Sequence, residues 1–84
     1  MTSQEIRDTI KKTISQITGV DAGAISDSAS FEEDLGLDSL SILEIAVNIE
    51  SLFKISASEE ELAAIRTVAD TVDFVKSRMP AEVA

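Results

Sequence analysis

The sequence predicts an all-α fold, a small bundle of three main helices plus one short helix, with a long loop between the first two helices. Apolar residues recur at spacings of three and four over residues 3–18, 39–53 and 67–79, which is the period of amphipathic helices. No stretch alternates apolar and polar residues as a half-buried strand does, and no segment is repeated. We therefore expect one domain of 84 residues, with a core over about 3–79 and a tail over 80–84.

The first helix is expected over residues 3–18. Thr2 and Glu5 can exchange hydrogen bonds as a capping box at its start, and Gly19 is a natural stop. Its apolar face consists of four isoleucines: Ile6, Ile10, Ile14 and Ile17. We assign this face to the core.

Residues 19–38 form a loop with neither a helical nor a strand period. A connection this long in so small a domain implies a function or some short structure of its own. Ser30 and Glu33 can cap a single turn around residues 31–34, and Gly36 permits backbone conformations closed to other residues. Three apolar residues are spaced as anchors to the core: Val20, Ile25 and Phe31.

The second helix is expected over residues 39–53, capped by Asp38 or Ser39. A surface helix needs one apolar stripe, but this helix carries two. The first stripe contains Ile42, Ile45, Ala46, Ile49, Leu52 and Phe53. The second continues round the helix with Leu40, Leu43 and Val47. We expect this helix both to be central to the core and to meet a partner or a ligand.

Two more helices follow. A short helix over about 59–65 begins at a capping box of Ser58 and Glu61, and a last helix begins at Thr67 with Asp70 as its capping partner. The inward residues of the short helix are Leu62 and Ile65. The apolar face of the last helix, and the proline that ends it, are Val68, Val72, Val75, Met79 and Pro80.

The chain contains neither cysteine nor histidine. Without cysteine there is no disulfide and no catalytic thiol. Without histidine the usual general base and the usual zinc ligand are missing. We therefore expect no stand-alone hydrolase, assign no catalytic residue to the chain and predict no metal site.

The net charge is −9, from 16 acids and 7 bases. This sign disfavours nucleic acid as a partner and favours basic protein surfaces. Residues 13–53 contain no base, and we interpret this span as a negative docking face. Its acids are Asp21, Asp27, Glu32, Glu33, Asp34, Asp38, Glu44 and Glu50.

Membrane and calcium functions are not expected. No segment approaches the roughly 20 apolar residues of a membrane span, and the N-terminus does not have the pattern of a signal peptide. The acids of residues 32–38 do not follow the ligand order of an EF-hand loop. We expect a cytoplasmic monomer.

Ser39 is the strongest candidate site. A serine after an aspartate at a helix start is most often only a cap, but here a long loop, a group of acids and an unusually apolar helix surround it. The free N–H groups of a first helical turn stabilise a phosphate. A serine nucleophile needs a base, and this chain offers none, so we expect another enzyme to modify Ser39.

The stretch Asp34-Leu35-Gly36-Leu37-Asp38-Ser39-Leu40 resembles the motif of acyl carrier proteins, and the order of helices resembles that family over about residues 3–79. The resemblance implies that a phosphopantetheinyl transferase moves a 4′-phosphopantetheine arm from coenzyme A to Ser39. The thiol of that arm would carry acyl groups as thioesters in fatty acid, polyketide or related lipid biosynthesis. The chain itself would be a carrier and not an enzyme.

The resemblance also implies roles for other residues. Asp38 would help to position the magnesium ion that serves the transferase. Acyl-transferring, condensing and modifying enzymes would bind through basic patches to Leu40, Glu44, Val47 and Glu50. An apolar interior that shelters the acyl chain would be lined by Phe31, Ile49, Phe53, Ile65, Val68 and Val72.

Three departures from the family pattern concern the pathway. Ser41, Asn48, Ser51 and Leu52 stand where carriers of bacterial fatty acid synthesis have a denser row of acids, the second helix is more apolar, and residues 55–58 lack the usual proline and aspartate. They favour a polyketide or modified-lipid pathway. Peptidyl and D-alanyl carriers remain alternatives, and so does an unmodified acidic helical adaptor that binds a basic protein.

Overall fold

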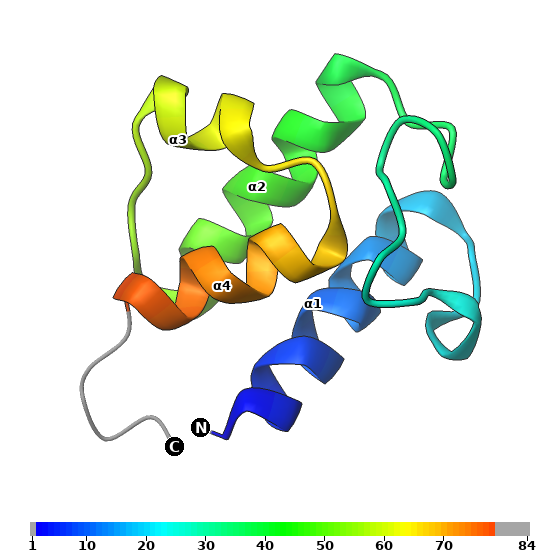
Figure 1. The fold of residues 1–84 in the computed structure, drawn as a ribbon, viewed down its shortest axis with the longest axis horizontal. Coiled ribbons are helices and arrows are strands. Elements are labelled where there is room, and N and C mark those ends of the chain that lie inside the picture. The colour runs from blue at the N-terminus through cyan, green and yellow to red at the C-terminus, as the bar shows by residue number, and fades with distance from the viewer. Residues whose placement is uncertain (1, 79–84) are drawn as a thin grey trace.

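The computed structural model describes residues 2–78 and shows the expected all-helical bundle (Figure 1). Its elements in chain order are α1 (Ser3–Thr18), the short 3-10 helix η1 (Ala22–Ala24), α2 (Ser39–Phe53), α3 (Glu59–Ala64) and α4 (Val68–Arg78). Within this described part no strand forms. The one isolated antiparallel bridge there joins Ser30 to Thr67.

The ends of α1 confirm the capping prediction. The Thr2 hydroxyl accepts a hydrogen bond from the Glu5 N–H at 3.1 Å, and the Glu5 carboxylate accepts one from the Thr2 N–H at 2.9 Å. Gly19 adopts the left-handed conformation with φ +81° and donates its N–H to the Ser15 carbonyl. The helix therefore begins and ends where local sequence alone places it.

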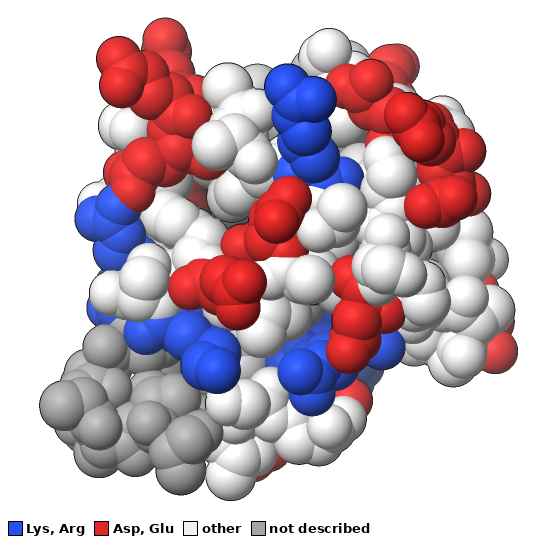
Figure 2. Space-filling view, in the orientation of Figure 1, with Lys and Arg blue, Asp and Glu red and all other residues white. Residues whose placement is uncertain are grey.

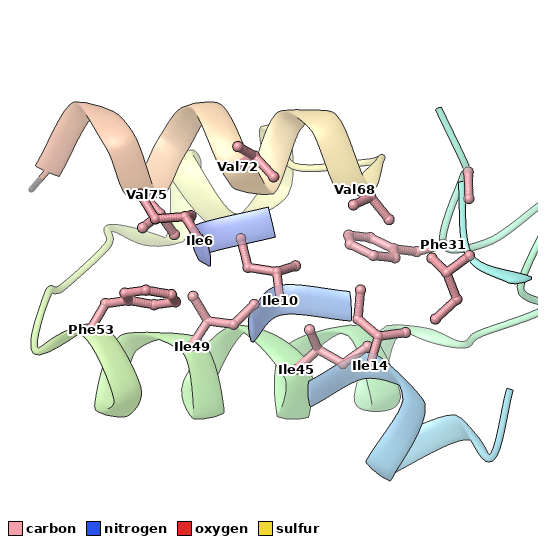
Figure 3. Close-up of a cluster of buried hydrophobic side chains, with 12 residues drawn as sticks. Ile6, Ile10, Ile14, Phe31, Ile45, Ile49, Phe53, Val68, Val72 and Val75 are labelled. Carbon is pink, nitrogen blue, oxygen red and sulfur yellow. The ribbon is translucent and has the colours of Figure 1, made fainter. Parts of the chain in front are cut away.

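The core lies where α1 packs against both α2 and α4 (Figure 3). Three of the four expected isoleucines of α1 are fully buried, whereas Ile17 is only half-buried. Phe31 reaches the core from the loop, with its ring beside Val68 (Figure 3). The buried hydrophobic residues are Ile6, Ile10, Ile14, Ile25, Ala29, Phe31, Ile45, Ile49, Phe53, Val68, Val72 and Val75.

The loop before α2 is held in place at several points. The Asp27 carboxylate pairs with Arg7 at 3.0 Å and with Lys11 at 2.8 Å, and its carbonyl accepts the Ala69 N–H at 2.8 Å. Ile25 and Phe31 are buried and Val20 is half-buried, as expected of anchors. The loop is thus tied to α1 and to the start of α4.

The turn that follows Ser30 differs in one partner from the prediction. The Ser30 hydroxyl accepts the Glu33 N–H at 3.2 Å, but the carboxylate that accepts the Ser30 N–H belongs to Asp34, at 2.6 Å. Glu33 was therefore the wrong acid for this reciprocal bond. The bond from the Asp34 N–H to the Ser30 carbonyl closes a helical turn, and this turn brings the Asp34 side chain back to Ser30.

The boundaries of the last three helices are close to those expected. α2 ends at Phe53 because Lys54 adopts the left-handed conformation with φ +55°. α3 stops at Ala64 and not at Ile65, whose extended backbone caps it. Thr67 lies just outside α4 and exchanges bonds with Asp70, which confirms that cap. The expected roles of Met79, Pro80 and the tail over 80–84 concern positions outside the described residues.

Candidate functional site

Ser39 is the first residue of α2, and its side chain is exposed. The cap of the helix is Asp38, whose carboxylate accepts the Ser41 N–H at 2.9 Å. Gly36, with φ +65°, turns the chain into this start, and the Leu37 N–H bonds to the Phe31 carbonyl at 2.9 Å. Asp38 therefore satisfies the helix end and leaves the Ser39 hydroxyl available for chemistry.

The Asp38 carboxyl is held in its charged form. Hydrogen bonds donated by Ser41, first from its backbone N–H and then from its side chain, lower the pKa of Asp38 below its ordinary value. Asp38 is therefore a carboxylate at neutral pH, exposed to solvent beside Ser39. An exposed carboxylate at this position is an oxygen ligand of the kind that Mg²⁺ prefers.

The outer face of α2 is strongly apolar for an exposed surface. Leu40 is 72% exposed, Val47 54% and Leu43 48%. Leu52, which belongs by spacing to the first apolar stripe with Ile45 and Ile49, is 56% exposed, so that stripe is not buried along its whole length. The buried residues of α2 are Ile45, Ile49 and Phe53.

The four residues expected to meet partner enzymes do not all lie on this face. Leu40, Glu44 and Val47 are exposed at helical spacing. Glu50 is half-buried, and its carboxylate accepts the Ala57 N–H at 3.2 Å. It therefore ties the end of α2 to the segment before α3, and its position is less suited to a docking contact than that of Glu44.

A cavity of about 510 Å³ lies between α2, α3 and α4, and Ser39 is one of its lining residues. Of the six residues expected to line such an interior, Phe31, Ile49 and Ile65 do so. The other three do not line the cavity and lie in the buried core, to which Phe31 and Ile49 also belong (Figure 3). These three are Phe53, Val68 and Val72.

Several cavity residues were not expected from the sequence. Two of them on α2 follow a simple rule, because Ile42 and Ala46 lie three and seven residues after Ser39 and so share its side of the helix. That spacing was a signal that could have found these two residues. The unexpected apolar lining residues are Ile42, Leu43, Ile45, Ala46, Leu62, Ala63 and Phe74.

The polar lining residues include both signs of charge. Glu32 and Glu33 from the turn before α2 line the cavity, and so does Arg66 from the segment between α3 and α4. In Figure 2, acidic side chains gather over α3 and over the loop before α2, and basic side chains lie mainly along the opposite edge. Ser39 therefore lines a mainly apolar cavity together with acidic side chains of the surface.

No helix of the described part is long and apolar enough to cross a bilayer. Within residues 2–78 there is also no cluster of three or more acidic side chains placed to hold a metal ion.

Comparisons with known proteins show the family of this chain. Residues 8–75 match the family model described as "Phosphopantetheine attachment site". The meromycolate extension acyl carrier protein of Mycobacterium leprae is 38% identical over 76 residues, which cover 90% of this chain and 66% of that protein. The acyl carrier protein of Chlamydia caviae is 36% identical over 73 residues, which cover 87% of this chain and 95% of that protein. The chain thus spans slightly less than two thirds of the length of the mycobacterial relative.

Two solved structures have the same fold. An acyl carrier protein from Enterococcus faecalis superposes with a TM-score of 0.78 and 31% identity, covering 93% of this chain and 99% of that chain. A putative acyl carrier protein from Mycobacterium tuberculosis superposes with a TM-score of 0.80 and 29% identity, covering 86% of this chain and 96% of that chain.

Proposed function

The chain belongs to the acyl carrier protein family, whose members bear phosphopantetheine, and on that premise we propose that Ser39 is the residue that holds the arm. The observation that carries this assignment is the position of Ser39. It is exposed, it is the first residue of α2, it leaves capping to Asp38, and it lines an apolar cavity. A group attached to Ser39 is accessible to an enzyme and lies beside the apolar cavity.

Ser39 is a substrate in this reaction and not a catalyst. The chain has no histidine to act as its base, so the transferase must remove the hydroxyl proton as the Ser39 oxygen bonds to phosphorus and the nucleotide part of coenzyme A leaves. Asp38 presents its carboxylate at the same place and would hold the magnesium ion of the transferase. When bound, the arm supplies the thiol that this cysteine-free chain does not have.

The cavity supports acyl cargo. Its walls are mainly aliphatic side chains from α2 and α3, with the Phe74 ring from α4, and Ser39 is one of its lining residues. Burial of an aliphatic chain there removes apolar surface from water at about 25 cal/mol per Å². Apolar walls favour fatty acyl or reduced polyketide chains over the polar cargo of a peptidyl or D-alanyl carrier.

The outer face of α2 supports docking of partner enzymes. Leu40 and Val47 supply exposed apolar surface, and Glu44 adds charge that would meet basic residues of a partner and steer the encounter. The partners would be a phosphopantetheinyl transferase and the acyl-transferring, condensing and modifying enzymes of a lipid or polyketide pathway. The relative named for meromycolate extension makes a specialised lipid pathway a reasonable first choice.

The test is a loading reaction followed by the mass of the intact chain. Wild type, Ser39→Ala and Ser41→Ala are incubated with coenzyme A, magnesium and a broad-specificity phosphopantetheinyl transferase. We expect wild type and Ser41→Ala to gain one phosphopantetheine and Ser39→Ala to gain none. Equal gains in all three would contradict the assignment of Ser39. No gain in folded wild type would contradict the carrier function.

A further inference from the structure

Arg66 is the one base among the residues that line the cavity within the described part of the chain. It lies in the short segment between α3 and α4 and is exposed. Three other bases have ion-pair partners: Arg7 and Lys11 pair with Asp27, and Arg78 pairs with Glu61. The guanidinium of Arg66 has no acidic partner among the described residues, although acids line the same cavity.

Backbone hydrogen bonds connect the segment that holds Arg66 to the turn that leads into Ser39. The Arg66 carbonyl accepts the Phe31 N–H at 3.0 Å, and the Phe31 carbonyl accepts the Leu37 N–H at 2.9 Å. Leu37 precedes Ser39 by two residues, a span of at most about 7 Å. Arg66 and Ser39 both line the same cavity. Arg66 is the one base of the segment between α3 and α4.

The backbone of Arg66 is also fixed from the other side. The Asp70 carboxylate accepts the N–H groups of Arg66 and of Thr67, each at 3.1 Å. Asp70 is in the first turn of α4, so the backbone of Arg66 is hydrogen-bonded both to that helix and to the turn at Phe31. The long Arg66 side chain therefore extends from a backbone position that is held on both sides.

A phosphate attached to Ser39 would lie among negative charges, so a cation beside it would be stabilising. A phosphodiester on Ser39 adds a negative charge beside Asp38 and close to the exposed Glu32 and Glu33. The start of α2 offers it limited help, because the Ser41 N–H already bonds to the Asp38 carboxylate. Arginine can bind two phosphate oxygens at once through two parallel hydrogen bonds, so it is well suited to hold a phosphodiester in one orientation.

We propose that Arg66 pairs with the phosphodiester of the arm on Ser39 and thereby turns the arm toward the cavity. This inference rests on the proposed function of Ser39. Arg66 acts as a positioning residue, since it touches the phosphate and not the thiol. Without it the arm would move freely over an acidic surface that repels the phosphate.

The experiment follows the phosphorus atom of the arm by ³¹P NMR in loaded protein, after the mass of each sample has shown that it carries the arm. The variants are Arg66→Gln and, as a matched loss of one exposed positive charge away from the cavity, Lys76→Gln. In wild type and Lys76→Gln we expect a broad ³¹P line whose width changes with salt concentration. In Arg66→Gln we expect a narrower line whose width does not change with salt. The same ³¹P line width and salt response in all three would overturn the inference.

A second measurement needs no variant. The Arg66 Nε–H resonance of wild type is compared before and after loading, and we expect a shift and slower exchange with water in the loaded form. An unchanged Arg66 signal in protein that has gained the arm would overturn the pairing and leave Ser39 as the attachment residue. Failure of wild type to gain the arm would overturn both.

Discussion

At the scale of single residues, Asp38 and Ser39 have different tasks although they are neighbours. Asp38 accepts the Ser41 N–H and so completes the start of α2, while the Ser39 hydroxyl stays available. The sequence predicted the site and left open which of the two residues is the cap. Side-chain geometry decides this, because either residue has an oxygen that can accept the bond.

The state of Asp38 gives a prediction about pH. Its folded pKa is lowered, so the stability it contributes is present above the unfolded value of about 3.9 and is lost as the pH falls through the folded pKa. A ¹³C titration of the Asp38 carboxyl should give a midpoint below that of the unfolded chain. We expect Ser41→Pro, which removes the N–H that Asp38 accepts, to raise the midpoint. A wild-type midpoint at or above the unfolded value would contradict this description of the cap.

Arg66 and most of the cavity lining were not predicted from the sequence. Arg66 lies between two helices, so no apolar period in the sequence marks it. Its segment is joined to the turn before α2 by the bond from the Phe31 N–H to the Arg66 carbonyl, which the sequence does not reveal. Phe53, Val68 and Val72 were assigned to the wrong apolar space, because core and cavity use the same residue types. Only packing between helices separates the two.

At the scale of elements, helix bounds were the best-predicted feature. The bounds of α1 and α2 agree with the expected ranges, and those of α3 and α4 differ by one residue where the described chain allows comparison. Caps and apolar periods are local, which is why they are legible in the sequence. The turn at Ser30 was less predictable, since Glu33 and Asp34 are both suitable acids and the fold selects one.

The end of α2 gives a stability prediction. Lys54 holds φ +55°, a conformation that costs a residue with a β-carbon more than it costs glycine. Lys54→Gly should therefore raise the free energy of unfolding by up to about 1 kcal/mol, and Lys54→Ala should not. Urea denaturation of the two variants and wild type measures this. A loss of stability in Lys54→Gly would show that the left-handed cap carries no strain.

The cavity between α2, α3 and α4 gives a prediction about cargo. Ala46 lines it, whereas Ala64 on α3 is exposed and does not. Ala46→Phe should fill the space, leave loading at Ser39 unchanged and speed the hydrolysis of a long acyl thioester, which would then lie in water. Ala64→Phe is the control and should match wild type. Equal hydrolysis rates in all three would contradict shelter of the acyl chain in this cavity.

At the scale of the whole molecule, charge works against compactness. With a net charge of −9 on 84 residues, the acidic side chains repel one another. The ion pairs of the described part are partly exposed and contribute little to the stability of the fold. Raising NaCl from about 0.01 to 0.15 M shortens the screening length from about 30 to 8 Å, so the melting temperature should rise. Glu33→Gln, which removes one exposed acid, should show a smaller rise. A melting temperature that falls with salt would mean that ion pairs outweigh the repulsion.

The central claim about the whole molecule is that this chain carries a phosphopantetheine arm on Ser39. The most direct measurement is the intact mass of the chain purified from its own host, with fragments that locate any added mass. We predict an added 4′-phosphopantetheine, with or without an acyl group, on the fragment that contains Ser39. A chain that is folded and unmodified throughout the purified pool, or one modified at another serine, would contradict the claim.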